Sequence, residues 1–171
     1  HQYDGTSNVM IADYSDSLKF SQLTSYDNGF QMFKLSWFNE SIIYDGVFKH
    51  GRNIYTVDMK GSSNFKKMQL TDERDPNYNK NQNITIWSED KDEVFNLYYE
   101  DSIGIHKLTD VIGGAFYPAI SSDGKVAFSL YEQGKYKLAI IEDFKSQNKN
   151  SIDINEDWES FLIEVDTKTD N

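Results

Sequence analysis

The sequence has 171 residues, of which 38% are hydrophobic and 15% aromatic. This is enough apolar chain for a folded domain with its own core, and too much for a disordered segment. Seventeen basic residues against 28 acidic ones give a formal net charge of -11, so binding to nucleic acid or to an anionic membrane surface is not expected. No apolar run approaches the roughly 18 residues that span a bilayer, so direct membrane insertion is not expected either. The chain has no cysteine, which excludes disulfides and thiolate metal sites.

Two short sequence marks recur in the same order along the chain. The first is an asparagine with an aspartate five residues later: NVMIAD at 8–13, NIYTVD at 53–58 and NLYYED at 96–101, with KLAIIE at 137–142 as a fourth copy. The second is a Leu-Thr dipeptide, found at Leu23-Thr24, Leu70-Thr71 and Leu108-Thr109. The first mark recurs every 41 to 45 residues, which predicts an array of similar units.

Each unit is predicted to contain four strands. Inner strands are expected at 31–37 and 118–122, and second strands at 42–48, 84–89 and 125–131. The third strand carries the asparagine mark. The outer strand ends at Leu-Thr, and its polar residues suit an exposed sheet edge. The Asp123-Gly124 pair predicts a hairpin, after which Val126, Phe128 and Leu130 alternate on one face. Helical periodicity is absent, so the sequence predicts an all-β fold of four-stranded antiparallel sheets, typical of β-propeller blades.

The segment YPAISSDGKVAF at 117–128, together with IYTVD at 54–58 and Leu70-Thr71, resembles the repeat of the TolB-like, WD40-like (PD40) propeller family. The resemblance covers about residues 8–142. Two copies depart from the family's Ser-Pro-Asp-Gly turn. SWFNESIIYDGVF at 36–48 lacks it, and PNYNKNQNITIWSED at 76–90 replaces it with asparagine-rich chain, so a different turn geometry is expected there.

About three to four blades are expected in residues 1–142, and propellers close their ring with roughly four to eight. We therefore expect part of a larger propeller, and the first residue, His1, is consistent with a mature form or a piece. The alternative is an unusual closure by strands from 151–165. The polar tail at 143–171 is expected to supply a last outer strand and a linker, with Trp158 covering an exposed edge.

No catalytic, cofactor or metal site is predicted. The three histidines, His1, His50 and His106, lack the spacing of a metal site, and we expect solvated surface histidines. The sequence has no Gly-x-Ser-x-Gly motif of a serine hydrolase, and no segment matches a calcium-binding loop.

The resemblance implies a non-catalytic propeller that binds protein in the bacterial periplasm or cell envelope. The expected contact loops lie on one face of the ring, at 26–30, 49–52, 72–76, 90–93, 111–115 and 132–135. The candidate contact residues are His50, Arg52, Arg74, Tyr117 and Glu132. The alternative is the substrate-gating propeller of a prolyl-oligopeptidase-like serine peptidase whose catalytic domain lies outside this chain. A propeller lyase or hydrolase with a site at the centre of the ring is a third hypothesis, which no residue of the sequence supports.

Overall fold

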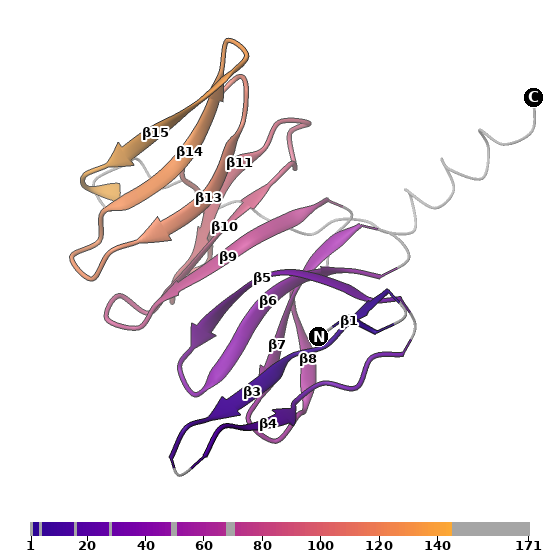
Figure 1. The fold of residues 1–171 in the computed structure, drawn as a ribbon. Helices are drawn as coiled ribbons and strands as arrows, with labels where there is room; N and C mark the ends of the chain where they lie inside the picture. Colours follow the sequence, from indigo (N-terminus) through magenta and orange to yellow (C-terminus); the bar gives the residue numbers. More distant parts are fainter. Residues whose placement is uncertain are drawn as a thin grey trace, which may run out of the picture.

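The computed structural model describes residues 2–3, 5–15, 17–27, 29–48, 51–67 and 71–144. These residues form 15 β-strands in five antiparallel sheets (Figure 1). None of their elements is a helix long and apolar enough to cross a membrane. The prediction of an all-β fold with propeller blades is confirmed.

Two sheets have four strands each, and in both the strands pair in chain order. Sheet 2 contains β5 (Gln31–Phe38), β6 (Ser41–Val47), β7 (Arg52–Asp58) and β8 (Ser63–Lys67). Sheet 3 contains β9 (Glu73–Asn79), β10 (Ile84–Glu89), β11 (Asn96–Glu100) and β12 (Ile105–Lys107).

The remaining sheets are smaller. Sheet 4 has three strands, β13 (Ala115–Ile120), β14 (Val126–Glu132) and β15 (Lys135–Ile141). Sheet 1 is the pair β3 (Met10–Asp13) and β4 (Lys19–Gln22), and the short pair β1 (Gln2–Tyr3) and β2 (Thr6–Ser7) precedes it. The described residues thus hold three inner, three second, four third and three outer strands. Two inner strands differ from the expectation, because β9 lies where no strand was expected and β13 spans Ala115–Ile120 rather than 118–122.

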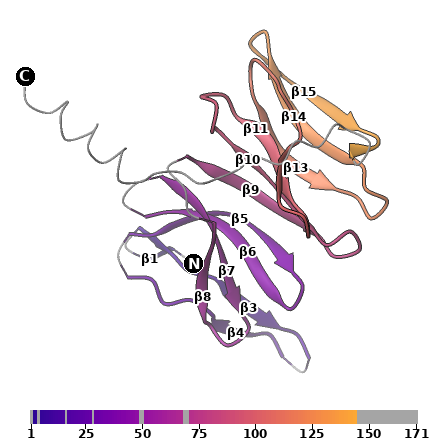
Figure 2. The ribbon, with the colours of Figure 1, turned by 180° about the vertical axis from the view of Figure 1, so that it is seen from behind.

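The sheets follow one another in space as they do in the chain, from sheet 1 at the bottom of Figure 1 to sheet 4 at the top, and Figure 2 shows the same order from behind. We call the face that a sheet turns toward the next copy its forward face, and the opposite one its backward face.

Three apolar clusters fill the spaces between successive sheets. Between sheets 1 and 2 lie Val9, Phe30, Ile42, Tyr44, Tyr55 and Val57. Between sheets 2 and 3 lie Ile43, Ile54, Trp87 and Tyr98. Between sheets 3 and 4 lie Ile84, Ile86, Leu97, Tyr99, Leu108, Ala115, Val126 and Phe128.

Hydrogen bonds join the two sequence marks in sheets 1 and 3, whereas in sheet 2 the Thr71 hydroxyl donates to Glu89 Oε1 instead. In sheet 1 the Thr24 hydroxyl donates to Asn8 Oδ1 at 2.9 Å, and in sheet 3 the Thr109 hydroxyl donates to Asn96 Oδ1 at 3.0 Å. In both copies the threonine oxygen also accepts the backbone N–H of the residue after the asparagine. This Asn–Thr clasp fastens the end of the outer strand to the start of the third strand.

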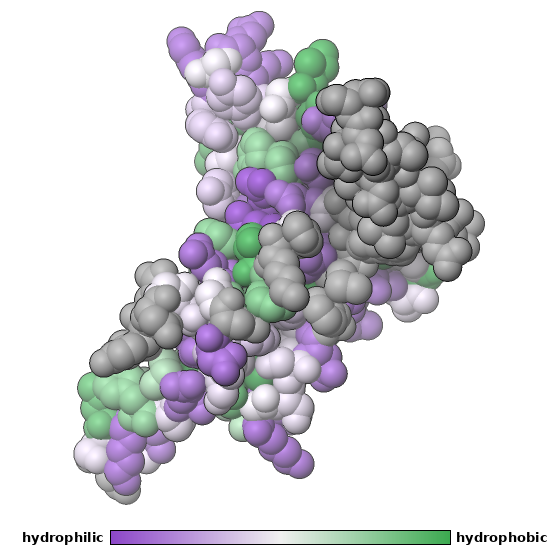
Figure 3. All heavy atoms as spheres, turned by 90° about the vertical axis from the view of Figure 1, so that its right-hand side faces the viewer, coloured by the Kyte–Doolittle hydropathy of each residue, from purple (hydrophilic) through white to green (hydrophobic). Residues whose placement is uncertain are grey.

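The fourth copy differs, because Lys137 stands where the asparagine mark would be, and its ammonium lies 2.7 Å from a Glu132 carboxylate oxygen. The residue Phe144 after β15 is buried and packs edge-on against Tyr99, with the ring centroids 5.2 Å apart. The predicted outer strand and linker after this point, with Trp158, lie outside the described residues, so the division at residue 142 stays a prediction. In Figure 3 apolar side chains reach the surface at the height of sheet 4 and again near sheet 1.

Candidate functional site

Each inner strand carries an irregularity at the same place, near its start. Sheet pairing shifts register around Phe33-Lys34 in β5, around Asp75-Pro76 in β9 and around Tyr117-Pro118 in β13. These dipeptides are 42 residues apart, and Asp75 and Tyr117 both have positive φ, at 57° and 54°. Such bulges re-aim side chains at a strand's end, so three sheets direct equivalent residues to one edge of the molecule.

Contacts across the sheets bring these three bulges together. Lys34 Nζ donates to the Pro118 carbonyl at 3.3 Å, although the two residues are 84 positions apart. The backbone N–H of Tyr117 donates to Asp75 Oδ2 at 3.4 Å. We call the three bulges, with Asp45 and Arg52, the bulge cluster. It lies at the edge where β7 begins, on the same side as the second-to-third strand loops.

Arg52 links two sheets within the bulge cluster. Its Nε donates to Asp45 Oδ2, and its second guanidinium nitrogen lies 3.7 Å from Asp75 Oδ1. The other Asp45 oxygen accepts the backbone N–H of Lys34 at 3.0 Å. The guanidinium also lies 4.0 Å from the centre of the Phe33 ring. Two buried carboxylates and two cations therefore hold one another in place, which is how buried charge is tolerated.

Burial shifts the ionisation of this cluster. It raises the pKa of Asp75, and the neighbouring Asp45 carboxylate adds to the rise, while Arg52 and Lys34 oppose it. Burial lowers the pKa of Lys34, and the two carboxylates oppose that change. The dominant cause in both groups is removal from water, which disfavours the charged form of each side chain.

Two aromatic residues lie at this network, Phe33 with its ring against the Arg52 guanidinium and Tyr117 through its backbone N–H to Asp75. Phe33 is half-exposed, and Tyr117 is 61% exposed. In the part of the chain that the structure describes, no group of three or more His, Asp or Glu side chains is placed to hold a metal ion. The carboxylates of the cluster are engaged by Arg52 and by backbone amides, so the arrangement presents aromatic surface over fixed charge and suits binding.

Arg74 joins the same edge through Asp72. Its guanidinium donates to Asp72 Oδ2 at 2.9 Å and lies 4.2 Å from the centre of the Phe95 ring. The other Asp72 oxygen accepts the backbone N–H of Arg52 at 2.9 Å. Of the five candidate contact residues, the structure thus brings Arg52, Arg74 and Tyr117 together. The expectation of a loop at 72–76 is wrong, because β9 already begins at Glu73, which pairs with Glu89.

The other candidates lie elsewhere. Glu132 is exposed at the end of β14 and borders a cavity of about 250 Å³. This cavity is also lined by Asp110, Val111, Ile112, Gly113, Leu130 and Tyr131. His50 lies outside the described residues.

The expectation of a solvated His106 is wrong. Its side chain stacks on the Tyr99 ring, with centroids 4.8 Å apart, and the residue is only 2% exposed. Its Nε2 lies 3.1 Å from Asp101 Oδ1. The cause is strand alternation, because His106 lies opposite Tyr99 in the pairing of β11 with β12 and so shares its buried face.

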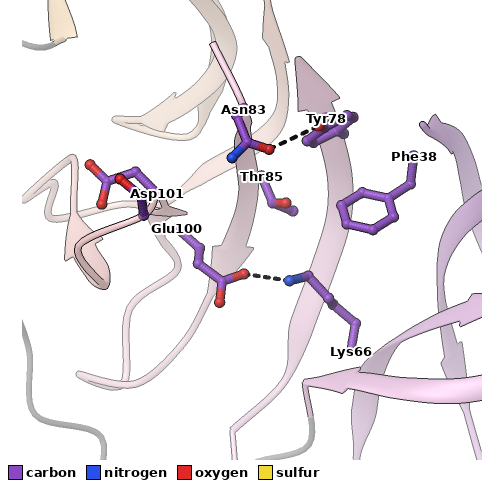
Figure 4. A pocket seen from close by; sticks show the side chains of 8 residues that line it. Phe38, Lys66, Tyr78, Asn83, Thr85, Glu100 and Asp101 are labelled. Carbon is purple, nitrogen blue, oxygen red and sulfur yellow. Dashed lines mark hydrogen bonds and ion pairs between the residues drawn. The ribbon is translucent and has the colours of Figure 1, made fainter. Parts of the chain in front are cut away.

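A second pocket, of about 210 Å³, lies between sheets 2 and 3 at the opposite ends of the strands (Figure 4). It is lined by Phe38, Lys66, Tyr78, Asn83, Thr85, Glu100, Asp101 and Ser102. Lys66 and Glu100 point toward each other from neighbouring sheets and form an ion pair of 2.6 Å. The Tyr78 hydroxyl donates to Asn83 Oδ1 at 3.0 Å. These polar groups form an ion pair and a hydrogen bond with one another, so the pocket is a polar contact between two sheets.

Sequence reasoning missed Lys34, Asp45 and Asp75, which complete the bulge cluster. One signal was available for Asp75. The chain has only two prolines, and both follow a bulge residue, in Asp75-Pro76 and Tyr117-Pro118. Their spacing of 42 residues matches the repeat. Asp45 had no such signal, because nothing in its surroundings in the sequence indicates burial with an arginine.

Searches against protein-family models and against curated proteins give no match. Solved structures do resemble the chain. TolB from Acinetobacter baumannii has a TM-score of 0.61 at 19% identity, over 77% of this chain and 34% of that one. A putative TolB from Agrobacterium tumefaciens gives 0.60 at 13%, over 78% and 55%. Hydrazine synthase from Kuenenia stuttgartiensis gives 0.57 at 16%, over 79% and 27%.

The chain spans less than two thirds of each of these proteins, and the identities are low, so the likeness is one of fold. It agrees with the repeats found in the sequence and with the order of the sheets. The chain has the fold of β-propeller blades and is similar in that fold to TolB.

Proposed function

We propose that this protein is a non-catalytic propeller scaffold that binds a protein partner through the edge carrying the bulge cluster. The observation that carries the proposal is the exposed Tyr117 ring, held at positive φ beside a buried ion network. Positive φ is unfavourable for a bulky side chain, and residues held in that way concentrate at functional sites. Aromatic and arginine side chains are also the commonest anchors of protein interfaces.

The chemistry of the cluster supports binding over catalysis. One of the solved structures that the chain resembles is named as an enzyme, hydrazine synthase, so fold alone does not decide the matter. In the bulge cluster, however, each carboxylate is engaged: Asp45 by Arg52 and the Lys34 amide, and Asp75 by Arg52 and the Tyr117 amide. Neither is a free base beside a nucleophile.

The net charge of -11 favours a partner with a basic surface, because complementary charge speeds encounter and selects partners. The resemblance to TolB-like repeats supports a place in the bacterial periplasm or cell envelope. Cell fractionation tests this location directly, and a cytoplasmic protein would contradict it.

Photo-crosslinking tests the binding edge. A benzophenone amino acid at position 117 should capture one protein in cells, and the same group at position 14 should not. Tyr14 is a matched control because it is 77% exposed, in the hairpin between β3 and β4. The captured protein is then purified and titrated against variants of this chain.

We expect Tyr117→Asn to weaken that binding at least tenfold, and Tyr14→Asn to leave it unchanged. Asparagine is chosen because it tolerates positive φ, so the backbone of the bulge is kept. Equal capture from both positions, or equal affinity of both variants, would show that the bulge cluster is not the contact surface.

A further inference from the structure

One cross-strand pair of the repeat changes its chemistry in sheet 3. The pair is apolar in the neighbouring sheets: Ile42 opposite Val57 in sheet 2, and Val126 opposite Ile141 in sheet 4. Both pairs contribute to the apolar packing on the backward faces of their sheets. In sheet 3 the equivalent pair is Thr85 and Glu100. The asparagine mark supports this equivalence, because Val57 and Glu100 each follow its asparagine by four residues.

The polar pair faces a cavity at a place where the other sheets have apolar core. Thr85 and Glu100 line the cavity of about 210 Å³ that Figure 4 shows between sheets 2 and 3, which we call the polar pocket. Thr85 is only 4% exposed, so a hydroxyl group occupies a buried position that is isoleucine in sheet 2 and valine in sheet 4. Natural sequences depart from the rules of their own fold mainly at functional sites. The polar pocket is therefore a candidate ligand site.

Aromatic rings and hydrogen-bonding groups line the polar pocket together. Phe38 and Tyr78 meet edge to face, with their ring centroids 4.6 Å apart. Lys66 Nζ donates to Glu100 Oε2 at 2.6 Å (Figure 4). The Tyr78 hydroxyl donates to Asn83 Oδ1 at 3.0 Å. Among the described residues, nothing further binds Glu100 Oε1 or Asn83 Nδ2. The pocket thus offers a ligand both donors and acceptors beside an apolar surface.

The chemistry of the polar pocket favours a neutral ring that carries hydroxyl groups. Each hydroxyl group both donates and accepts, so neighbouring hydroxyls of one ligand can bind an ammonium, an amide and a carboxylate at once. An apolar ligand would leave these groups without partners. An anion would lie beside Glu100 and Asp101, in a chain of net charge -11, and a cation would lie beside Lys66. The C–H face of a ring can pack on Phe38 or Tyr78, which removes apolar surface from water.

We propose that the polar pocket binds a single sugar ring of a saccharide. Lys66 binds its hydroxyl groups from sheet 2, Thr85 and Glu100 bind them from sheet 3, and Tyr78 packs against its C–H face. The volume of the pocket agrees with one ring, because it far exceeds the ~10–15 Å³ that one water needs and lies below the roughly 300–1,000 Å³ of pockets for drug-sized ligands. This inference does not depend on the proposed partner, because none of these residues belongs to the bulge cluster.

Titration of the 171-residue chain with sugars, followed by NMR, tests the proposal. The probes are glucose, galactose, mannose, xylose, N-acetylglucosamine and N-acetylgalactosamine. We expect at least one of them to shift the backbone amide signals of Asn83, Thr85 and Glu100 saturably, with a dissociation constant of about 1 mM, because a small ligand in an open pocket binds weakly. The methyl glycoside of that sugar then separates two sources, since a free sugar presents its anomeric hydroxyl and a unit within a chain does not.

Two further probes check the class of ligand. Inorganic phosphate represents an anion and benzyl alcohol an apolar ring, and neither should shift these amide signals saturably. The proposal is overturned if no sugar gives a saturable shift at these amides, or if phosphate or benzyl alcohol binds more tightly than every sugar.

Variants then locate the bound sugar. Thr85→Ile combined with Glu100→Val reproduces the apolar pair of sheet 2 and should weaken binding about tenfold or more, because the hydrogen-bonding groups are lost. Glu100→Gln keeps the shape of the side chain and should weaken binding about fivefold, because hydrogen bonds to a charged group are stronger. Glu142→Val is the matched control, since Glu142 also pairs with a lysine, Lys125 at 2.9 Å, and lies outside the pocket. Unchanged affinity in both Glu100 variants, or an equal loss in the control, would overturn the proposal.

Discussion

Sheets 3 and 4 are built from equivalent strands, yet only sheet 3 has both faces covered. All six residues of β10 are buried, whereas most of β15 is exposed. The local sequence therefore decides that a strand forms, and the neighbouring sheet decides how much that strand contributes to stability. This is the behaviour of a repeat array, in which each unit is stabilised by contacts with the next.

The largest expected difference lies between two equivalent leucines. Leu97→Ala should lower the free energy of unfolding by about 2–5 kcal/mol, because it opens a cavity between two sheets. Leu138→Ala should change it by less than about 0.5 kcal/mol in the 171-residue chain, because its side chain faces solvent. Urea denaturation measures both. Equal losses in this chain would mean that something already covers Leu138.

The next contrast concerns charge between sheets. Asp45→Ala should cost about 2–3 kcal/mol, since it leaves the Arg52 guanidinium and the Lys34 amide without their buried acceptor. Asp45→Asn retains an acceptor for the amide and should cost less. If the two variants unfold at the same urea concentration, the hydrogen bond to Lys34 contributes nothing measurable.

A smaller effect is expected for the serines at the same repeat position. Ser88→Ala should cost about 1–2 kcal/mol, because the Ala115 carbonyl loses a buried donor. Ser129→Ala should be close to neutral in the 171-residue chain. A neutral Ser88→Ala would show that the contact between sheets 3 and 4 depends on apolar packing alone.

The smallest effect is a pH dependence at Asp75. Its pKa is raised in the folded protein by burial and by Asp45, so the folded state binds the proton more tightly. The resulting stabilisation is full below the unfolded pKa of about 3.8 and is lost as pH rises through the folded value. Relative to Asp75→Asn, the protein should therefore lose about 1 kcal/mol or less between pH 3.5 and pH 7. A relative gain would show that pairing with Arg52 outweighs burial.

Most strands and their order could be predicted from the sequence, because alternation and turn residues are local signals. The inner strand β9 could not, because its polar sequence ERDPNYN has no apolar alternation. The Asn–Thr clasp gives the two marks a shared structural role in the first and third copies. The bulge cluster could not be predicted as a unit, because Lys34, Asp75 and Pro118 meet only after three sheets have packed. Arg52, Arg74 and Tyr117 were named as separate candidates, and their role in binding stays a prediction.

The separations along the chain also bear on the order of folding. The clasp joins residues 16 positions apart in the first copy and 13 apart in the third, whereas Lys34 and Pro118 are 84 apart. Short loops close with a smaller loss of entropy than long ones, and local contacts form faster. The third and outer strands of a copy should therefore pair early, and the edge proposed to bind a partner should be completed last. Partner binding would then report that the successive sheets have finished assembling.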